Sequence, residues 1–599
     1  MGRHIKQKMP ELNYPPLTPV RRLLRLLGQF RREIRYIILY AIVVGVINLS
    51  LPLGIQAIIG IIAGGGISAS WGVLVFFVCL GALLVGVLRI MQLSIMEYMQ
   101  RQIFAGATVE FAVRIPRLNL EALRKEHLPE LVNRFFDTLT LQKGLPKLLI
   151  DGSTAILQIL FSLLLLSFYH PAFVTFSLLL LGVLAILFYM TGPKGLQTSL
   201  RESKYKYKLA FWLEEIGRVA ATFKLAGENR FPVRRADDLT VDYLEARAGH
   251  WRILVTQFAG SVAFRVLVLG GFLVLGSLLV MDNQLNIGQF VASEILVLFV
   301  IESVEKLVLL HETGYDVLTA TEKLGQFGDL PIEREDGILI EEFCPGDALS
   351  LELRDLSYRY DDGVSPVLND LNLTIGAGER VAVAGYDGSG KSTLLQILSA
   401  VRRDFKGSLY FNGLPKRNIN LRSLREHIGD LSSQEDIFKG TIRENITLGS
   451  EHLPLQRVLE VVEEVGLSDF IRQSPQGLDA ELLPGGKNIP RSVITKILIA
   501  RAIAPKPKLL AMEEPQGNLN YRDRLRVARL LTDKRYPWTL VSVTTDPLLA
   551  AACDRVVVLR NGRIVFDGPF REVQKTEHYE RIFRTTADAE NSPETDKNS

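Results

Sequence analysis

The chain has 599 residues, of which 48% are hydrophobic, and its formal net charge is only +4. This length exceeds what one ordinary hydrophobic core organises, so two or more domains are expected. The three cysteines, Cys79, Cys344 and Cys553, lie far apart and form no paired motif. Neither a disulfide framework nor a cysteine metal cluster is therefore expected.

Six apolar stretches occupy the first half of the chain. Each is close to or above the roughly 20 residues that a helix needs to cross a bilayer. They come in pairs, and the connection within each pair is short and contains no lysine or arginine. We therefore predict an all-α transmembrane domain of six helices over residues 36–330. The predicted spans are Tyr36–Ala63, Trp71–Met96, Leu145–Phe168, Ala172–Met190, Ile253–Val280 and Ile287–Leu310.

Basic residues gather outside the pairs. Residues 1–35 contain nine Lys or Arg, residues 97–148 contain eight, and residues 191–252 contain twelve. Because Lys and Arg concentrate on the cytoplasmic side of a membrane, the segment 1–35, both long connections and both termini are predicted to be cytoplasmic. The long connections also have helical spacing, with reversals at Asn119–Glu130 and Phe211–Lys224. This describes a multi-pass protein of the cell's inner or plasma membrane, surrounded by lipid.

Four charged residues fall within the predicted spans, where a charge is costly and indicates function by default. Arg265 and Glu302 lie at a similar depth, which would allow them to pair. Arg89 is at a comparable depth, whereas Glu294 is closer to the outer face and is a candidate for lining a substrate path. For Arg89, Arg265 and Glu302 the alternative stays open that they lie near the cytoplasmic boundary and face water.

From about Leu351 the pattern changes to short β-type runs that alternate with helices, which is typical of an α/β domain and extends over residues 345–585. The polar residues 586–599 are predicted to form a disordered tail. LELRDLSYRY, NDLNLTI and RVAVAG are predicted strands. Directly after the third strand comes GYDGSGKST, residues 385–393, which matches G-x-x-x-x-G-K-[ST] in the required strand–loop–helix setting.

This glycine-rich loop predicts binding of ATP and Mg²⁺. Its glycines let backbone amides turn toward phosphates. Lys391 offers a charge to the β- and γ-phosphates, Ser392 offers a hydroxyl to magnesium, and a helix from Thr393 onward directs its positive dipole end at the anion. The predicted nucleotide contacts in the loop are Gly385, Asp387, Gly388, Ser389, Gly390, Lys391, Ser392 and Thr393.

A second motif, which is acidic, lies downstream of the glycine-rich loop. PKLLAMEEP places an apolar strand before Glu513 and Glu514. Two carboxylates at a strand end beside a phosphate loop predict metal support from Glu513 and activation of water by Glu514. Without the phosphate loop, a surface acidic pair would be the better interpretation.

Together these residues resemble the ABC transporters, in particular half-transporters of the exporter type. YRYDDGVSPVLNDLNLTIGAGERVAVAGYDGSGKSTLL, GTIRENI and VVVLRNGRIVFDG are similar to family landmarks, and short sections resemble the type I secretion and peptide exporter branch most. The resemblance implies the ABC exporter fold for the six-helix transmembrane domain, joined to an α/β P-loop nucleotide-binding domain. It also implies that Tyr360 stacks on adenine.

The catalytic motifs depart from the family pattern. Residues 489–493, IPRSV, stand where the signature LSGGQ is usual, and Glu513 replaces an aspartate. Thr545 occupies the position of the switch histidine, and Asn520 that of another aspartate. The magnesium-sensing glutamine aligns with Ser433, although Gln434 is adjacent and is our candidate metal contact. We therefore expect ATP binding, with hydrolysis that is weak, absent or dependent on a partner.

Two functions follow from this resemblance. The first is an ATP-driven exporter that works with a second half-transporter, as a homodimer or a heterodimer, and for which a periplasmic adaptor protein is conceivable. The second is a degenerate pseudo-ATPase in which ATP is a structural or gating ligand. A soluble P-loop enzyme or a nucleic-acid ATPase does not fit six spans, so no nucleic-acid partner is expected. The substrate is not indicated.

Overall fold

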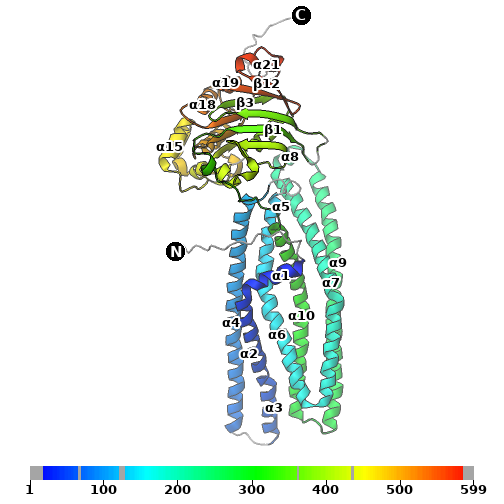
Figure 1. Ribbon diagram of the computed structural model, residues 1–599. Coiled ribbons are helices and arrows are strands. Elements are labelled where there is room, and N and C mark those ends of the chain that lie inside the picture. The colour runs from blue at the N-terminus through cyan, green and yellow to red at the C-terminus, as the bar shows by residue number, and fades with distance from the viewer. Residues whose placement is uncertain are drawn as a thin grey trace. The chain divides into compact units, whose positions relative to one another are not determined.

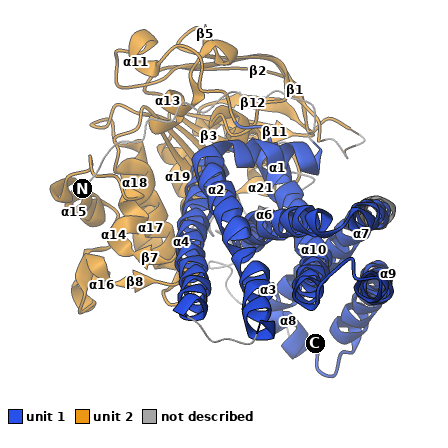
Figure 2. Ribbon diagram, turned by 90° about the horizontal axis from the view of Figure 1, so that it is seen from below, with its two compact units in different colours: residues 1–332 blue, residues 333–599 orange. Residues whose placement is uncertain are grey.

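The computed structural model describes residues 18–64, 69–119, 128–360, 363, 365–432 and 437–583. By its internal contacts the chain divides into two compact units, residues 1–332 and residues 333–599 (Figure 2). The first unit is helical throughout its described residues, apart from short connections. The second unit combines sheets with shorter helices.

Unit 1 is built mainly from long helices that run side by side (Figure 1). Its α-helices are α1 Pro19–Leu27, α2 Arg31–Asn48, α3 Ser50–Ala63, α4 Ala69–Arg114, α5 Leu128–Asn133, α6 Asp137–Tyr169, α7 Pro171–Arg218, α8 Ala220–Leu225, α9 Phe231–Met281 and α10 Ile287–Gly328. The longest ones continue well past the predicted spans. The prediction that the long connections extend as helices is therefore confirmed for α4, α7 and α9.

Five stretches of described helix are long and apolar enough to cross a membrane. They are Pro19–Ala63, Ala69–Arg117, Glu130–Tyr169, Phe231–Met281 and Ile287–Gly328. The remaining predicted span, Ala172–Met190, lies in the first part of α7, where Pro171–Val183 forms a shorter apolar stretch. The first predicted span contains a break that we did not predict: α2 ends at Asn48 and α3 begins at Ser50. Pro52 in the first turn of α3 lacks an N–H, which explains the break.

Local sequence explains where α7 and α10 begin. Pro171 stands at the first position of α7, where its missing N–H costs nothing. Asn286 caps α10 by accepting a hydrogen bond from the Gln289 amide at 2.8 Å, and the Gln289 side chain accepts one from the Asn286 amide at 2.9 Å. This reciprocal capping box satisfies two amides that the helix itself leaves unpaired.

Arg265 and Glu302 do not pair. Arg265 on α9 donates to Glu305 on α10, three residues further along that helix, whereas Glu302 is exposed. Depth along the helix alone suggested Glu302. However, the side chains of Glu302 and Glu305, three residues apart on α10, point in directions that differ by about 60° around the helix axis. Arg89 is exposed and Glu294 is half-buried.

A second charged pair in unit 1 was not predicted. Lys306 on α10 lies 3.0 Å from Asp151 on α6, so both α9 and α6 are joined to α10 by ion pairs at neighbouring positions.

Unit 2 contains a four-stranded antiparallel sheet in the order β2-β1-β4-β5 and a six-stranded, mainly parallel sheet in the order β12-β11-β3-β10-β9-β6. The strands are β1 Leu351–Tyr358, β2 Leu368–Ile375, β3 Arg380–Gly385, β4 Lys406–Phe411, β5 Leu414–Pro415, β6 Ile428–Leu431, β7 Gly440–Thr441, β8 Glu481–Leu482, β9 Leu509–Glu513, β10 Thr539–Val543, β11 Arg555–Arg560 and β12 Arg563–Gly568. The three strands predicted in the first part of this unit match β1, β2 and β3.

Helices of unit 2 surround these sheets. They are α11 Ile340–Phe343, α12 Lys391–Leu398, α13 Leu421–Glu426, α14 Ile442–Thr447, α15 Leu455–Glu464, α16 Ser468–Gln473, α17 Arg491–Ile503, α18 Tyr521–Thr532, α19 Pro547–Ala552, α20 Phe570–Val573 and α21 Glu577–Ile582. Every residue of β3 and β10 is buried, because helices cover both faces of a parallel sheet. The carboxyl ends of β3, β10 and β9 are neighbours at one edge, where such sheets bind ligands.

Candidate functional site

The glycine-rich loop joins the end of β3 to the start of α12. Gly385, Gly388 and Gly390 have φ values of 157°, 71° and 95°. A Cβ on Gly390 would lie 2.6 Å from Leu368 Cδ2, so both the backbone conformation and the space require glycine there. Helix α12 begins at Lys391, with Gly390 as its N-cap, two residues earlier than we predicted. Its amino end therefore starts at the lysine itself.

Lys391 and Ser392 present their polar groups at this amino end. Lys391 Nζ donates to the carbonyl oxygens of Gly385 and Tyr386, each at 2.9 Å, and thereby closes the loop. Burial lowers the pKa of the Lys391 ammonium, and nearby carboxylates partly offset this effect. Ser392 Oγ donates to Glu513 Oε1, so the hydroxyl and the first carboxylate of the acidic pair do come together.

The loop also fits a bound phosphate. The side chain of Ser389 is almost fully buried, and its Oγ has no hydrogen-bond partner among the described residues. A buried hydroxyl left unpaired is costly, and a phosphate oxygen would satisfy it. Asp387 is exposed, so its carboxylate does not fill the loop. Ser392 and Glu513 supply the hard oxygen ligands that Mg²⁺ prefers.

Glu514 follows the last residue of β9 in a left-handed conformation, with φ 44°. Its amide donates to Val543 O at 2.8 Å, and its Oε1 accepts from the Thr545 amide at 3.0 Å. Burial raises the pKa of the Glu514 carboxyl above its ordinary value, and the hydrogen bond from Thr545 opposes this rise. Thr545, which stands where the family has a histidine, thus contacts the second carboxylate through its backbone.

Tyr360 lies beside the start of α12. Its hydroxyl is 3.0 Å from Thr393 Oγ1, a hydrogen bond that joins two residues of the predicted site. The guanidinium of Arg402 lies 4.9 Å from the centre of the Tyr360 ring. Arg402 was not predicted, because nothing in the local sequence indicates that it reaches this ring.

A second residue that sequence reasoning missed is His578, on the C-terminal helix α21. The Tyr386 hydroxyl, from the phosphate loop, lies 3.1 Å from His578 Nδ1. Arg560 at the end of β11 places its guanidinium 5.4 Å from the centre of the same Tyr386 ring. The Tyr386 carbonyl also accepts a hydrogen bond from Lys391, so Tyr386 links His578 to the lysine that is predicted to contact the nucleotide.

Replacing His578 by alanine is expected to weaken ATP binding to the full chain by roughly two- to tenfold, since one hydrogen bond contributes about 0.5–1.5 kcal/mol. Tyr386→Phe should weaken binding to a similar extent, and the double variant should lose no more than either single one. Isothermal titration with ATP measures the three affinities. His452→Ala removes an exposed histidine of the same unit and serves as the control. Additive losses would contradict a shared contact.

Two further predicted motifs remain. Ser433 and Gln434 lie outside the described residues. At the signature position, α17 begins at Arg491 with Pro490 as its N-cap and no side-chain cap. Asn488 does not cap this helix: its side chain accepts a hydrogen bond from the Leu483 amide at 2.9 Å and donates one to the Glu481 carbonyl at 3.0 Å.

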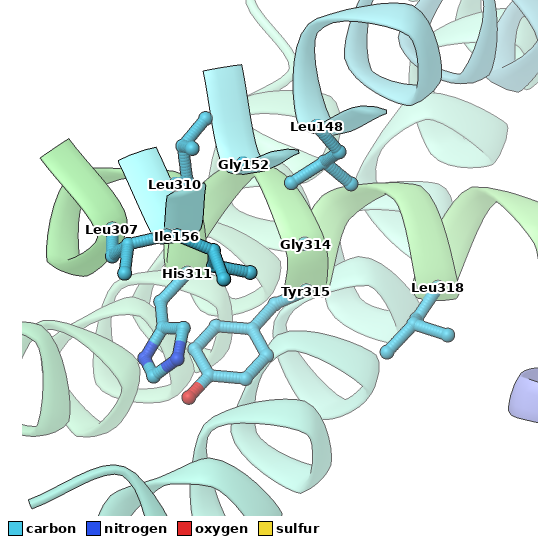
Figure 3. Close-up of a pocket in the computed structure, with 9 residues that line it drawn as sticks. All are labelled: Leu148, Gly152, Ile156, Leu307, Leu310, His311, Gly314, Tyr315 and Leu318. Carbon is cyan, nitrogen blue, oxygen red and sulfur yellow. The ribbon is translucent and has the colours of Figure 1, made fainter. Parts of the chain in front are cut away.

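Unit 1 contains a separate apolar pocket between α6 and α10, with a volume of about 520 Å³ (Figure 3). The rings of His311 and Tyr315 lie on one side of α10, with centres 5.8 Å apart, and are its polar elements. The Tyr315 hydroxyl accepts a hydrogen bond from Gln257 on α9 at 2.8 Å. The lining residues are Leu148, Gly152, Ile156, Leu307, Leu310, His311, Gly314, Tyr315 and Leu318.

Long apolar helices and a phosphate loop beside two carboxylates define a membrane protein that binds a nucleotide. Two family models match this chain: the ABC transporter model over residues 368–517 and the ABC transporter transmembrane region model over residues 34–304. The chain therefore belongs to the ABC transporter family, as a half-transporter of the exporter type with one transmembrane and one ATP-binding domain.

Similar proteins agree with this assignment. The transport/processing ATP-binding protein ComA of Streptococcus pneumoniae strain R6 is 24% identical over 575 residues, which cover 94% of this chain and 77% of ComA. The alpha-hemolysin translocation ATP-binding protein HlyB of Escherichia coli O157:H7 is 27% identical over 299 residues, 50% of this chain and 42% of HlyB. The chain spans 42–49% of the length of HlyB and of several other relatives.

A solved structure is similar in fold. The structure of a bacterial Atm1-family ABC exporter with ATP bound superposes with a TM-score of 0.81 at 17% sequence identity, covering 93% of this chain and 98% of that one. The predicted fold class, a helical transmembrane domain of the exporter type plus an α/β nucleotide-binding domain, is confirmed.

Proposed function

We propose that this half-transporter binds Mg-ATP at the phosphate loop and uses it to drive export across the membrane. The observation that carries the proposal is the meeting of Lys391, Ser392 and Glu513 at the amino end of α12. The family membership supports ATP as the ligand. Basic residues on the long connections support an orientation with both termini in the cytoplasm.

Each residue has a distinct proposed role. Lys391 and the loop amides hold the phosphates, and Tyr360 stacks on adenine. Ser392 and Glu513 hold magnesium, and Glu514 accepts a proton from water. The bound magnesium nucleotide supplies a metal-stabilised phosphoryl group as the electrophile. The carboxyl of Glu514 is held by the Thr545 amide, so its orientation does not depend on the absent histidine.

Half-transporters of this family function as dimers, so a second half-transporter is the proposed partner. In IPRSV, at the amino end of α17, Pro490 stands where the signature has its serine, and Arg491 and Ser492 stand where it has its two glycines. A partner with an intact signature would therefore complete this chain's site better than a second copy would. The names of ComA and HlyB, which refer to transport and processing and to translocation of a hemolysin, favour a polypeptide cargo. A periplasmic adaptor stays a prediction.

Glu514→Gln tests the chemistry. In sealed inside-out vesicles that contain the full-length chain with its partner, this variant is expected to keep ATP binding and to lose turnover by roughly 10²- to 10⁴-fold, the usual contribution of a general base. Phosphate release measures turnover, and right-side-out vesicles should show none until they are opened. Equal background rates in parent and variant, with ATP binding intact, would mean that ATP acts only as a structural or gating ligand.

A further inference from the structure

Helix α1 lies crosswise to the long helices of unit 1. In Figure 1 it crosses the bundle, and in Figure 2 it is seen lengthwise where the long helices are seen end-on. Its sequence, PVRRLLRLL, is strongly amphipathic. Leu23, Leu26 and Leu27 face the bundle, where they pack with Met99 and Val317 among others. This orientation is that of a helix lying in the plane of a membrane surface.

The helix is fastened by a buried arginine. Arg22 has only 8% of its side chain exposed; its Nε lies 3.2 Å from Glu322, and its Nη2 lies 2.5 Å from Asp329. Gly325 on α10 lies between these two acids in the sequence, and a Cβ there would come within 2.3 Å of Arg22 Nη1. The glycine therefore forms the notch that receives the guanidinium. Two carboxylates compensate the charge of Arg22, so this arginine fastens α1 to α10 and is not part of the exposed positive surface.

The outward side carries an excess of positive charge. Residues 18–35 contain six arginines and a single acidic residue, Glu33. Apart from Arg22, all of these arginines are exposed: Arg21, Arg25, Arg31, Arg32 and Arg35. Two apolar side chains lie among them, with Val20 48% and Leu24 60% exposed. Clustered exposed arginines beside exposed aliphatic residues differ from an ordinary solvated surface.

The level of α1 matches that of lipid headgroups. The first predicted span begins at Tyr36 on α2, and Arg31 at the start of α2 lies five residues before it, about 8 Å at 1.5 Å per residue. The headgroup layer on each side of the hydrocarbon core is about 5–8 Å thick. On α2, exposed aliphatic residues begin at Ile38 and Leu39, just after the last arginine.

We propose that α1 and the first two turns of α2 form a binding surface for anionic phospholipid. The lipid phosphates pair with the exposed arginines, whose planar guanidinium matches a phosphate well, and Val20 and Leu24 contact the edge of the acyl layer. The exposed aliphatic residues at bilayer depth favour lipid over an acidic polypeptide. Because Arg22 joins α1 to the last turns of α10, a bound lipid also holds the end of the last membrane helix.

Lipid counting on the intact chain tests the surface. The full-length protein in detergent is titrated with phosphatidylglycerol, and bound lipids are counted by native mass spectrometry. Replacing Arg21, Arg31, Arg32 and Arg35 together by glutamine is expected to weaken phosphatidylglycerol binding by about tenfold or more. Phosphatidylcholine binding should not change. Unchanged ATP affinity shows that the variant is folded.

A matched control separates this surface from general positive charge. Replacing four exposed basic residues elsewhere in unit 1 by glutamine should leave phosphatidylglycerol binding at the parent level. These residues are Lys204, Lys224, Arg230 and Arg234. Equal losses in both variants would overturn the proposal, as would no loss in the α1 variant or displacement of the lipid by inorganic phosphate at equal concentration.

A second variant tests the notch while keeping every arginine. Gly325→Ala should displace Arg22, loosen α1 and weaken phosphatidylglycerol binding several-fold. Gly328→Ala, on the same helix, adds a methyl group whose nearest neighbour is 3.9 Å away, so it should behave as the parent. Parent-like lipid binding in Gly325→Ala would overturn the role of the notch in presenting the surface.

Discussion

Replacing Lys391 by alanine is expected to lower the affinity of the full-length chain for Mg-ATP by about 30-fold or more. The ammonium is half-buried and held at 2.9 Å from two loop carbonyls, so it is already positioned where phosphate charge would arrive. Removing one member of a buried, hydrogen-bonded charge pair costs about 2–5 kcal/mol. That cost corresponds to the stated loss of affinity. Isothermal titration with Mg-ATP measures it.

Lys391→Ala also removes the hydrogen bonds that close the loop. The control must therefore also remove a lysine that donates to a backbone carbonyl. The ammonium of Lys508 donates a hydrogen bond to the backbone carbonyl of Cys344 at 2.6 Å. Lys508 precedes β9, so it lies at the opposite end of this strand from Glu513. Lys508→Ala should therefore bind Mg-ATP like the parent. If Lys391→Ala binds with parent affinity, the phosphate loop is not the nucleotide site, and the proposed function fails with it.

Much of the fold was predictable because it depends on patterns that one sequence displays. Apolar length marks the membrane helices, and their continuation past the membrane follows from helical spacing in the charged connections. The break between α2 and α3 was missed although Pro52 indicates it, because apolar length alone does not distinguish one helix from two. The start of α12 was placed two residues late, since the glycine that caps it also belongs to the motif.

The candidate site likewise contains some residues that the sequence predicts and others that it does not. Its motif residues are close in sequence or end adjacent strands, so Lys391, Ser392 and Glu513 could be brought together from the pattern. Arg402 and His578 could not be predicted, because each reaches the site through tertiary packing; His578 is 192 residues from Tyr386. The partner of Arg265 was missed for a geometric reason: depth along a helix was considered without rotation about its axis.

The largest effect on stability is expected at Arg380, the first residue of β3. Its side chain donates to four carbonyls: those of Gly378 and Tyr536 at 2.6 Å, Asp533 at 3.0 Å, and Trp538. The residue is 1% exposed, and burial lowers the pKa of its guanidinium. Arg380→Ala would leave these carbonyls unpaired in the interior. Each carbonyl that water cannot reach then costs about 1–3 kcal/mol of stability. We expect a loss of at least about 3 kcal/mol in the local stability of unit 2.

Hydrogen exchange on the full-length chain, read by mass spectrometry, measures this loss where it occurs, because amide protection reports the free energy of local opening. Protection of β3 and β10 should fall most, since Arg380 joins the beginning of β3 to the segment that precedes β10. Arg529→Ala, on an exposed position of α18, is the control and should leave both strands protected. Because β3 ends at Gly385, weaker protection should extend to the phosphate loop and reduce ATP affinity. Full protection of β3 in Arg380→Ala would show that water or neighbouring groups replace the guanidinium, and that the buried charge is dispensable for holding the loop.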